Sequence, residues 1–288
     1  MQEPSNQSKQ GAGAVKPKIR VPGVRHLIAV ASGKGGVGKS TTTANLALAL
    51  KAQGLRVGVL DADIYGPSQP LILGVPENTK PDTHENKYFI PVEAHGLQLM
   101  SMGFLSDPAT PVVWRGPMIA SALSQFLNQT RWNDLDCLLV DMPPGTGDIQ
   151  LTLTQKFQLS GHIVVTTPQD IALLDVSKAI EMFDKMKVHC FGIVENMSTH
   201  TCSACGHEEA IFGELGGQAL AKERDIELLG ALPLSLSVRQ QSDAGEPIVV
   251  AQPESLESVR YIEMAAKLND KLKALPQDAE HNNVIVKL

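Results

Sequence analysis

The sequence lacks any run of about 18 apolar residues, the length that a membrane-spanning helix requires. Its beginning, MQEPSNQSKQGAGAVKPKIR, also lacks the apolar stretch of a secretory signal. We therefore predict a cytoplasmic protein with no membrane partner. Residues 1–20 have almost nothing apolar to bury, so we expect them to form a disordered arm.

Basic clusters are also missing from the part of the chain that should fold. The formal net charge is −6, whereas binding to the phosphates of a nucleic acid requires grouped Lys and Arg side chains. We therefore predict no nucleic-acid partner.

Cysteine is scarce, with four residues among 288, and a reducing cytosol does not favour structural disulfides. Cys137 and Cys190 lie in the apolar runs DCLLVD and VHCFGIV, which indicates small buried side chains. Cys202 and Cys205, separated by two residues in HTCSACGH, are therefore left as candidates for chemistry.

The chain does contain an alternation of short apolar runs with longer segments of helical length. We expect strands at 26–32, 56–63, 136–143, 161–168 and 189–196, a weaker one at 226–233, and helices at 39–54, 170–186, 215–225 and 254–274. This order is typical of an α/β fold with a mostly parallel sheet flanked by helices. One domain should span residues 21–275, followed by a tail at 276–288. Residues 75–110 interrupt the alternation and are predicted to form an inserted hairpin.

A glycine-rich motif, GKGGVGKS at residues 33–40, joins the first expected strand to the first expected helix. It fits the phosphate-loop pattern G-x-x-x-x-G-K-[ST] in the context that this pattern requires. Glycine lets backbone N–H groups turn toward phosphate, and the amino terminus of a helix favours negative charge. Lys39 supplies a cation for the terminal phosphates, and Ser40 supplies a ligand for Mg²⁺. The motif therefore predicts a site for a nucleoside triphosphate.

Three of the same glycines, Gly33, Gly35 and Gly38, also fit the dinucleotide pattern G-x-G-x-x-G, with Asp61 at a suitable distance along the chain. The pair Lys39 and Ser40 decides between the two interpretations. A triphosphate with Mg²⁺ requires both side chains, whereas a dinucleotide requires neither.

Acidic side chains follow two of the expected strands, at the sheet edge where ligands of such folds bind. Asp61 and Asp63 come after the second strand, and alternate residues of an extended chain point to the same side. Both can therefore face the site, one toward Mg²⁺ and one toward the attacking water. Asp141 ends the next strand as a Walker B carboxylate should, and Gly145 in the following PPGTG loop is a candidate sensor of the γ-phosphate.

Lys34 is a second cation that can reach phosphate, either in the same site or across a dimer interface. The stretch KGGVGKS resembles the deviant Walker A motif of the MinD, ParA and nitrogenase-iron-protein class of dimeric ATPases. That resemblance implies that Lys34 reaches the partner's nucleotide. It also implies that Asp61 is the metal-side residue and that Asp63 positions the water. Asn196, at the end of the 189–196 run, then recognises adenine.

The spacing of Cys202 and Cys205 lets two thiolates reach one metal or cluster, but such sites need about four ligands. Three completions are open. His200 and His207 can add two nitrogens for zinc, the pair can act alone as a redox dithiol, or a second copy of the chain can supply two more thiolates. The redox interpretation requires a helix that begins at the first cysteine, and no helical run begins there. Completion by a second copy agrees with Lys34, which also needs a partner chain.

Several stretches between about residues 20 and 265 together resemble the Mrp/ApbC family of iron–sulfur cluster carrier ATPases. They are SGKGGVGKS, LDADIYGPSQP, VWRGPM, DMPPGTGDIQLTL, TTPQDIALLD, GIVENMS, CSACG and IFG. The resemblance implies an ATPase that binds a [4Fe-4S] cluster between two subunits through Cys202 and Cys205 and passes it to apoproteins. ATP, Mg²⁺ and the cluster are then its cofactors. Its partners are a second copy, an assembly scaffold and the recipient apoproteins. Many bacterial members carry a small domain before the ATPase part, and this sequence starts almost directly at that part.

Related functions share such a nucleotide site. A ParA-like DNA-partition ATPase should present a basic surface, and the net charge of −6 counts against this. A MinD-like membrane ATPase should end in a basic amphipathic helix, whereas ALPQDAEHNNVIVKL is short and mixed. The remaining alternative is a MinD/ParA-like ATPase with a structural zinc site and a client that receives no cluster.

The predicted site combines these motifs. Its nucleotide-binding residues are Gly33, Lys34, Gly35, Gly36, Val37, Gly38, Lys39, Ser40, Thr41, Asp61, Gly145 and Asn196; its catalytic residues are Lys34, Lys39, Asp63 and Asp141; Mg²⁺ is expected at Ser40, Asp61 and Asp141; and the cluster is expected at Cys202 and Cys205.

Overall fold

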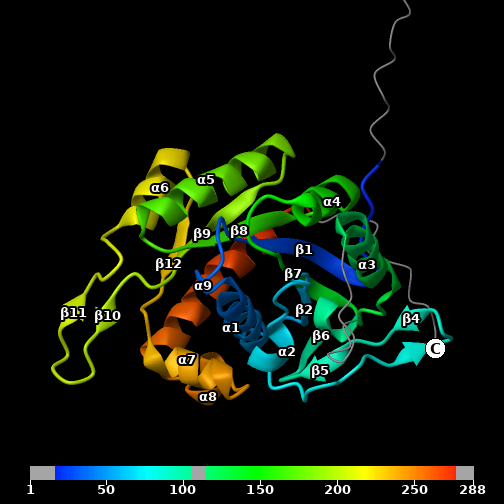
Figure 1. The fold of residues 1–288 in the computed structure, drawn as a ribbon, viewed down its shortest axis with the longest axis horizontal. Helices are drawn as coiled ribbons and strands as arrows, with labels where there is room; N and C mark the ends of the chain where they lie inside the picture. Colours follow the sequence, from blue (N-terminus) through cyan, green and yellow to red (C-terminus); the bar gives the residue numbers. More distant parts are fainter. Residues whose placement is uncertain (1–16, 106–114, 277–288) are drawn as a thin grey trace, which may run out of the picture.

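The protein folds around one large twisted sheet with helices on both faces (Figure 1). The computed structural model describes residues 17–105 and 115–276. Within these residues the main sheet has eight strands in the order β12-β9-β8-β1-β7-β2-β6-β5, and every neighbouring pair is parallel except β5 with β6. The strands of this sheet are β1 (Val24–Ala31), β2 (Val57–Asp61), β5 (Val92–Ala94), β6 (Leu97–Ser101), β7 (Leu135–Asp141), β8 (Gly161–Thr166), β9 (Cys190–Glu195) and β12 (Leu228–Ala231).

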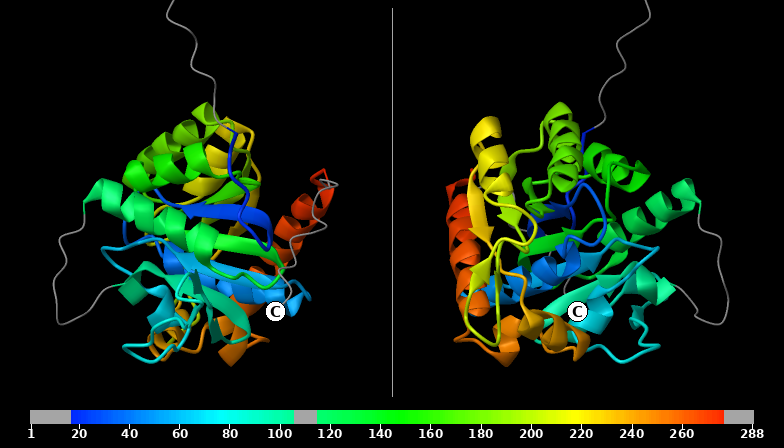
Figure 2. Two further views of the ribbon diagram at one scale, coloured as in Figure 1. Left: turned by 90° about the vertical axis from the view of Figure 1, so that its right-hand side faces the viewer. Right: turned by 60° about the vertical axis from the view of Figure 1, so that its left-hand side comes forward.

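Helices cover the two faces of the sheet in separate groups, which the views of Figure 2 show from two sides. The first group is α1 (Lys39–Ala52), α2 (Gln69–Ile72), α7 (Leu236–Asp243), α8 (Ile248–Ala251) and α9 (Leu256–Ala274). The second group is α3 (Gly116–Gln129), α4 (Asp148–Lys156), α5 (Asp170–Lys185) and α6 (Gly216–Arg224). Each face of the sheet therefore has its own apolar core.

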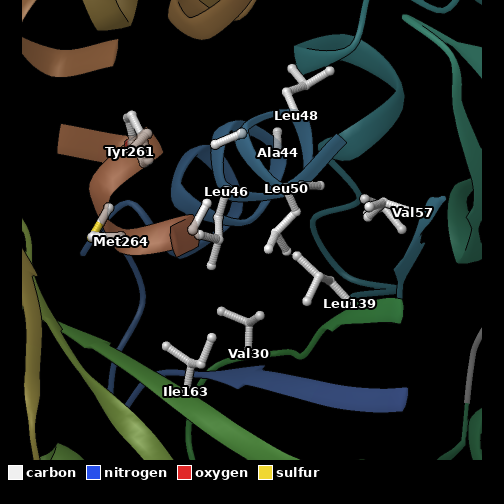
Figure 3. Close-up of a cluster of buried hydrophobic side chains, with 14 of the residues drawn as sticks. Val30, Ala44, Leu46, Leu48, Leu50, Val57, Leu139, Ile163, Tyr261 and Met264 are labelled. Carbon is white, nitrogen blue, oxygen red and sulfur yellow. The ribbon is translucent and has the colours of Figure 1, made fainter. Parts of the chain in front are cut away.

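The central helix α1 is buried almost all round, because it lies between the sheet and α9. Figure 3 shows Leu46 and Leu50 of α1 directed toward Val30 and Leu139 of the sheet. Tyr261 of α9 packs into the same core. Burial of each such large apolar side chain contributes roughly 1.5–3 kcal/mol to folding. The helix that follows the glycine-rich motif is thus fixed firmly in place.

The predicted strands and helices are all present, with ends that differ from the predicted ranges by a few residues. The sequence did not reveal α3, α4 or α7, nor the short helices α2 and α8. The predicted arm, residues 1–20, falls mostly outside the described residues, as does the predicted tail, residues 276–288. Packing of the described chain begins at Ile19, whose N–H donates to the carbonyl of Lys156 at 2.7 Å.

The expectation of an inserted hairpin at 75–110 is only partly right. The short strands β3 (Thr83–His84) and β4 (Tyr88–Phe89) form a small antiparallel pair. β5 and β6 also pair antiparallel, but they belong to the main sheet, because β6 lies parallel to β2. Leu97 and Leu99 of β6 are fully buried in the core, which explains why this strand joins the sheet. A 3₁₀ turn, η1 (Met102–Leu105), follows β6.

Among the helices of residues 17–105 and 115–276, none has the length and apolar character needed to cross a membrane.

Candidate functional site

The glycine-rich motif forms a tight loop between the carboxyl end of β1 and the amino end of α1. Gly36 and Gly38 both have a φ of 81°, in the left-handed region that favours glycine. Gly38 is the N-cap of α1 and carries no side chain that would block the free N–H groups of the first helical turn. The loop therefore presents backbone donors at a helix amino terminus, which is the geometry of an anion site.

Lys39 and Asp141 form a buried ion pair at the base of this loop. The ammonium Nζ of Lys39 donates to Oδ1 of Asp141 and lies 3.3 Å from Oγ of Ser40. Lys39 is 7% exposed and Asp141 is fully buried. The Oγ1 of Thr43 donates to the same carboxylate oxygen at 3.3 Å. The loop lysine is thus held by the Asp141 carboxylate in this structure.

Asp61 lies beside Asp141, because the two residues are register partners at the ends of the parallel strands β2 and β7. Its Oδ2 accepts hydrogen bonds from the N–H of Ser68 at 2.9 Å and from Oγ of Ser101 at 3.1 Å. Burial first, and then the neighbouring charge of Asp141, raise the pKa of Asp61 to about 7, although N–H donors and Lys39 act in the opposite direction.

These two carboxylates fit a divalent cation. Both Asp61 and Asp141 are fully buried, and the charge of Asp141 raises the cost of ionising Asp61. Hard oxygen donors of this kind, with a serine hydroxyl nearby, are what Mg²⁺ prefers in nucleotide sites. Ser40, Asp61 and Asp141, the three predicted ligands, therefore lie at one place in the fold.

Asp63 does not share the position of Asp61. The strand β2 ends at Asp61, so Asp61 and Asp63 are not alternate residues of one extended strand and need not point to the same side. Its Oδ1 instead accepts the N–H groups of Tyr65 and Gly66, both at 3.2 Å. The carboxylate closes a turn of its own loop, a use that short acidic side chains often have.

The N–H of Gly145, the predicted phosphate sensor, donates a hydrogen bond to the carbonyl of Ser32 at 2.9 Å. Its own carbonyl accepts from Nε2 of Gln150 at 3.0 Å. In this conformation the PPGTG loop is therefore hydrogen-bonded to Ser32, just before the phosphate loop. The Gly145 N–H is not available to phosphate.

Two further predicted residues contact the phosphate-loop region from other elements. The Nδ2 of Asn196, which follows β9, donates to the carbonyl of Val37 at 2.8 Å. The Nζ of Lys34 donates to Oε1 of Gln169, the N-cap residue of α5, at 2.8 Å. Asn196 thus braces the loop, and Lys34 is held by its own chain. Gly35 and Thr41 contribute backbone at the loop and the first turn of α1.

Gln69 is the residue that the sequence reasoning missed. It is fully buried, and its Nε2 donates both to Oδ2 of Asp141 and to the carbonyl of Ser40, each at 2.9 Å. Its backbone N–H donates to Oδ2 of Asp61 at 3.0 Å. The only signal in the sequence was its nearness to Asp61 in LDADIYGPSQP.

Cys202 and Cys205 lie at the tip of a small hairpin made by β10 (His200–Thr201) and β11 (Glu208–Glu209), which projects from one side of the molecule in Figure 1. Cys202 is half-buried and Cys205 is exposed. The N–H groups of Ala204 and then Cys205, directed at the sulfur of Cys202, lower the pKa of this thiol. A turn that stabilises a thiolate in this way is suited to binding a metal or a cluster.

The remaining cysteines and histidines are placed differently. Burial raises the pKa of both Cys137 and Cys190 to about 12. Cys137 is fully buried, as predicted, whereas Cys190 is half-buried. The Nδ1 of His200 lies 3.3 Å from the carbonyl of Leu234, at the base of the hairpin. Across residues 17–105 and 115–276, no three His, Cys, Asp or Glu side chains gather closely enough to hold a metal ion. Within the described residues, one copy of the chain therefore offers two thiol ligands, Cys202 and Cys205, at the hairpin.

Comparison with known proteins identifies the family. Residues 23–269 match the model of the ParA family described as "NUBPL iron-transfer P-loop NTPase". The chain belongs to this family of P-loop NTPases. The "Iron-sulfur cluster carrier protein" of Pseudomonas fragi is 56% identical over 253 residues, which are 87% of this chain and 88% of that protein.

Two solved structures share the fold of this family member. The nucleotide-binding protein of Archaeoglobus fulgidus in complex with ADP is 38% identical, with a TM-score of 0.70 over 82% of this chain and 91% of that one. The septum site-determining protein MinD of Pyrococcus horikoshii, complexed with Mg-ADP, is 24% identical, with a TM-score of 0.63 over 86% and 97%. At that identity the likeness to MinD concerns the fold alone. The predicted family and the predicted P-loop fold class are confirmed.

Proposed function

We propose that this P-loop NTPase is an ATP-dependent carrier of iron–sulfur clusters. It binds and slowly hydrolyses ATP with Mg²⁺, holds a [4Fe-4S] cluster between two copies of the chain, and passes the cluster to apoproteins in the cytoplasm. One observation carries the cargo assignment: the exposed hairpin presents two free thiols, and backbone N–H groups lower the pKa of the one on Cys202. Because a cluster of this type takes about four thiolates, two hairpins complete one site.

The nucleotide half of the proposal rests on the phosphate loop. The N–H groups at Gly36 to Lys39 and the amino end of α1 would cradle the phosphates. Binding of ATP would draw the Lys39 ammonium from Asp141 to the terminal phosphates, because the triphosphate brings the larger negative charge. Mg²⁺, held by Ser40 and by Asp61 and Asp141 directly or through water, would neutralise charge on those phosphates. Asp63 can orient the attacking water once it leaves the turn that it closes in this structure.

The second copy is supported by the surface beside Lys34. Gln169, which holds Lys34, is the N-cap of helix α5, and Ile171 and Leu174 of that helix are 64% and 65% exposed. Leu215, in the loop that packs on Pro168 and α5, is also 64% exposed. Large apolar side chains grouped on a surface are typical of an interface with another protein. We assign this face to the second copy.

The route between the two halves is short. The residue after β9, Asn196, bonds to the phosphate loop, and the same segment continues into the hairpin that carries Cys202. A shift of the phosphate loop on nucleotide binding can therefore move the base of the hairpin. This contact supports coupling between nucleotide state and loading or release of the cluster.

The test is the content of iron, acid-labile sulfide and zinc per dimer after anaerobic reconstitution. We expect about four iron and four sulfide, lost in Cys202→Ser and Cys205→Ser. The control is Cys190→Ser, which removes a thiol away from the hairpin and should retain the cluster. One zinc per chain, retained when the dimer dissociates, would contradict the carrier function and favour the zinc-containing ATPase with a different client.

A further inference from the structure

Gln69 contacts all three predicted ligands of Mg²⁺, through its side chain and its backbone N–H. Its Nε2 contacts Asp141 and the backbone of Ser40, and its N–H contacts Asp61. These residues belong to α1, β2 and β7, so Gln69 at the start of α2 ties three elements together. A buried amide with this many bonds to one site is a candidate for more than packing.

The chemistry of its neighbours fixes the direction of the carboxamide. The partners on one side are a carboxylate oxygen and a carbonyl oxygen, which only accept hydrogen bonds. The NH₂ group must therefore face Asp141 and Ser40, because the opposite orientation would set oxygen against oxygen.

The other end of the carboxamide is consequently an acceptor. The Oε1 of Gln69 is buried and has no hydrogen-bond partner among the described residues. A buried polar atom without a partner costs roughly 1–3 kcal/mol, and a water or another donor that the chain itself does not supply would remove this cost. Mg²⁺ in nucleotide sites keeps several bound waters, and each of these is a donor.

We propose that Gln69 is a positioning residue of the Mg²⁺ site. Its amide nitrogen fixes Asp141 against Ser40, its backbone N–H fixes Asp61, and its Oε1 accepts a hydrogen bond from a water on the metal. The inference rests on the nucleotide half of the proposed function and is independent of the cluster.

The experiment measures the dissociation constant of ADP with Mg²⁺ and with EDTA, for wild type and for Gln69→Leu. Removal of the carboxamide should weaken binding in Mg²⁺ by about tenfold and leave binding in EDTA within about twofold. The matched control is Gln53→Leu, because the Nε2 of Gln53 bonds to Ile262 far from the site. The inference is overturned if Gln69→Leu keeps the wild-type ratio of the two constants.

A second variant decides the matter if Gln69→Leu does not fold. Gln69→Glu keeps the shape but places a third carboxylate against Asp61 and Asp141, so Mg²⁺ alone should raise its melting temperature more than that of wild type. A rise no larger than that of Gln53→Glu would overturn the inference. If wild type itself binds ADP equally with and without Mg²⁺, both the inference and the proposed Mg²⁺ site fail. If wild type binds no ADP, the proposed nucleotide site fails, and the iron and sulfide measurement is independent of either result.

Discussion

At the residue scale, two glycines of the phosphate loop have the same backbone angle but different surroundings. A Cβ on Gly36 would meet nothing within 4 Å, whereas a Cβ on Gly38 would lie 2.2 Å from Nδ2 of Asn196. Gly36 is therefore required only for its positive φ. Gly38 is required both for its positive φ and because a side chain there would clash with Asn196.

We predict that Gly38→Ala is more damaging than Gly36→Ala. Both variants incur about 1–2 kcal/mol for an L residue in the left-handed region. Gly38→Ala also displaces Asn196 from Val37, which should weaken nucleotide binding further. Denaturant unfolding and ADP titration of both variants measure the two effects. Equal losses in the two variants would contradict a bracing role for Asn196.

His162 gives a prediction about pH. It is fully buried on β8 and stacks on Phe183 with ring centroids 4.0 Å apart. Burial lowers the pKa of His162 to about 3. The unfolded chain takes up this proton below about pH 6.5, and the folded chain does not, so protonation favours unfolding as the pH falls from 6.5 toward 3.

We expect the difference in free energy of unfolding between wild type and His162→Phe to change as the pH falls. Between pH 7 and pH 5, the free energy of unfolding of wild type should fall relative to the variant by about 2 kcal/mol. Urea titrations at the two pH values measure it, with the exposed His207→Phe as the control. Parallel pH curves for wild type and His162→Phe would show that His162 protonates in the folded protein.

At the scale of elements, the phosphate loop rests directly on helix α5. A Cβ on Gly33 would lie 2.3 Å from the backbone carbon of Asp175, which shows how closely the two elements approach. The Oε1 of Gln169, just before α5, accepts from Lys34 at 2.8 Å. The start of α5 therefore determines where the second lysine of the motif lies in a single chain.

We predict opposite effects for two substitutions at Gln169. Gln169→Glu would hold the Lys34 ammonium more strongly through an ion pair and weaken dimer formation with an ATP analogue. Gln169→Ala would release Lys34 and strengthen it, each by a few-fold, as expected for a partly exposed charge pair. Sedimentation velocity measures the dimer dissociation constant. Changes of the same sign in both variants would indicate that Lys34 has no role at the interface.

At the scale of the whole molecule, the proposed second copy has two separate tasks: it completes the cluster site and it exchanges Lys34. The first task follows from the two thiolates of each hairpin and the second from the resemblance to dimeric ATPases. Mixed dimers can separate the two tasks, because each copy can carry a different substitution.

We predict that mixing Lys34→Ala with Lys39→Ala chains partly restores ATP hydrolysis. In the mixed dimer, one nucleotide site combines an intact Lys39 with an intact Lys34 from the other copy. The measurement is the turnover rate across mixing ratios, compared with the sum of the two homodimers. Turnover no greater than that sum would assign Lys34 a role within its own chain.

The amino-acid sequence by itself determined the phosphate loop, the six strands and four helices of the alternating pattern, and the family. These features depend on neighbouring residues: glycines that allow a positive φ, a lysine and serine at a helix start, and apolar runs with a fixed period. It also singled out Cys202 and Cys205, because a short spacing is a local property.

Only the tertiary structure decided which distant residues meet. Asp61 and Asp141 become neighbours through the register of two parallel strands, and Gln69 reaches Asp141 across 72 positions in the chain. The bond of Gly145 to Ser32 and the placement of β6 in the sheet likewise required the fold. Such contacts depend on how elements pack, and nothing in the local sequence pattern specifies them.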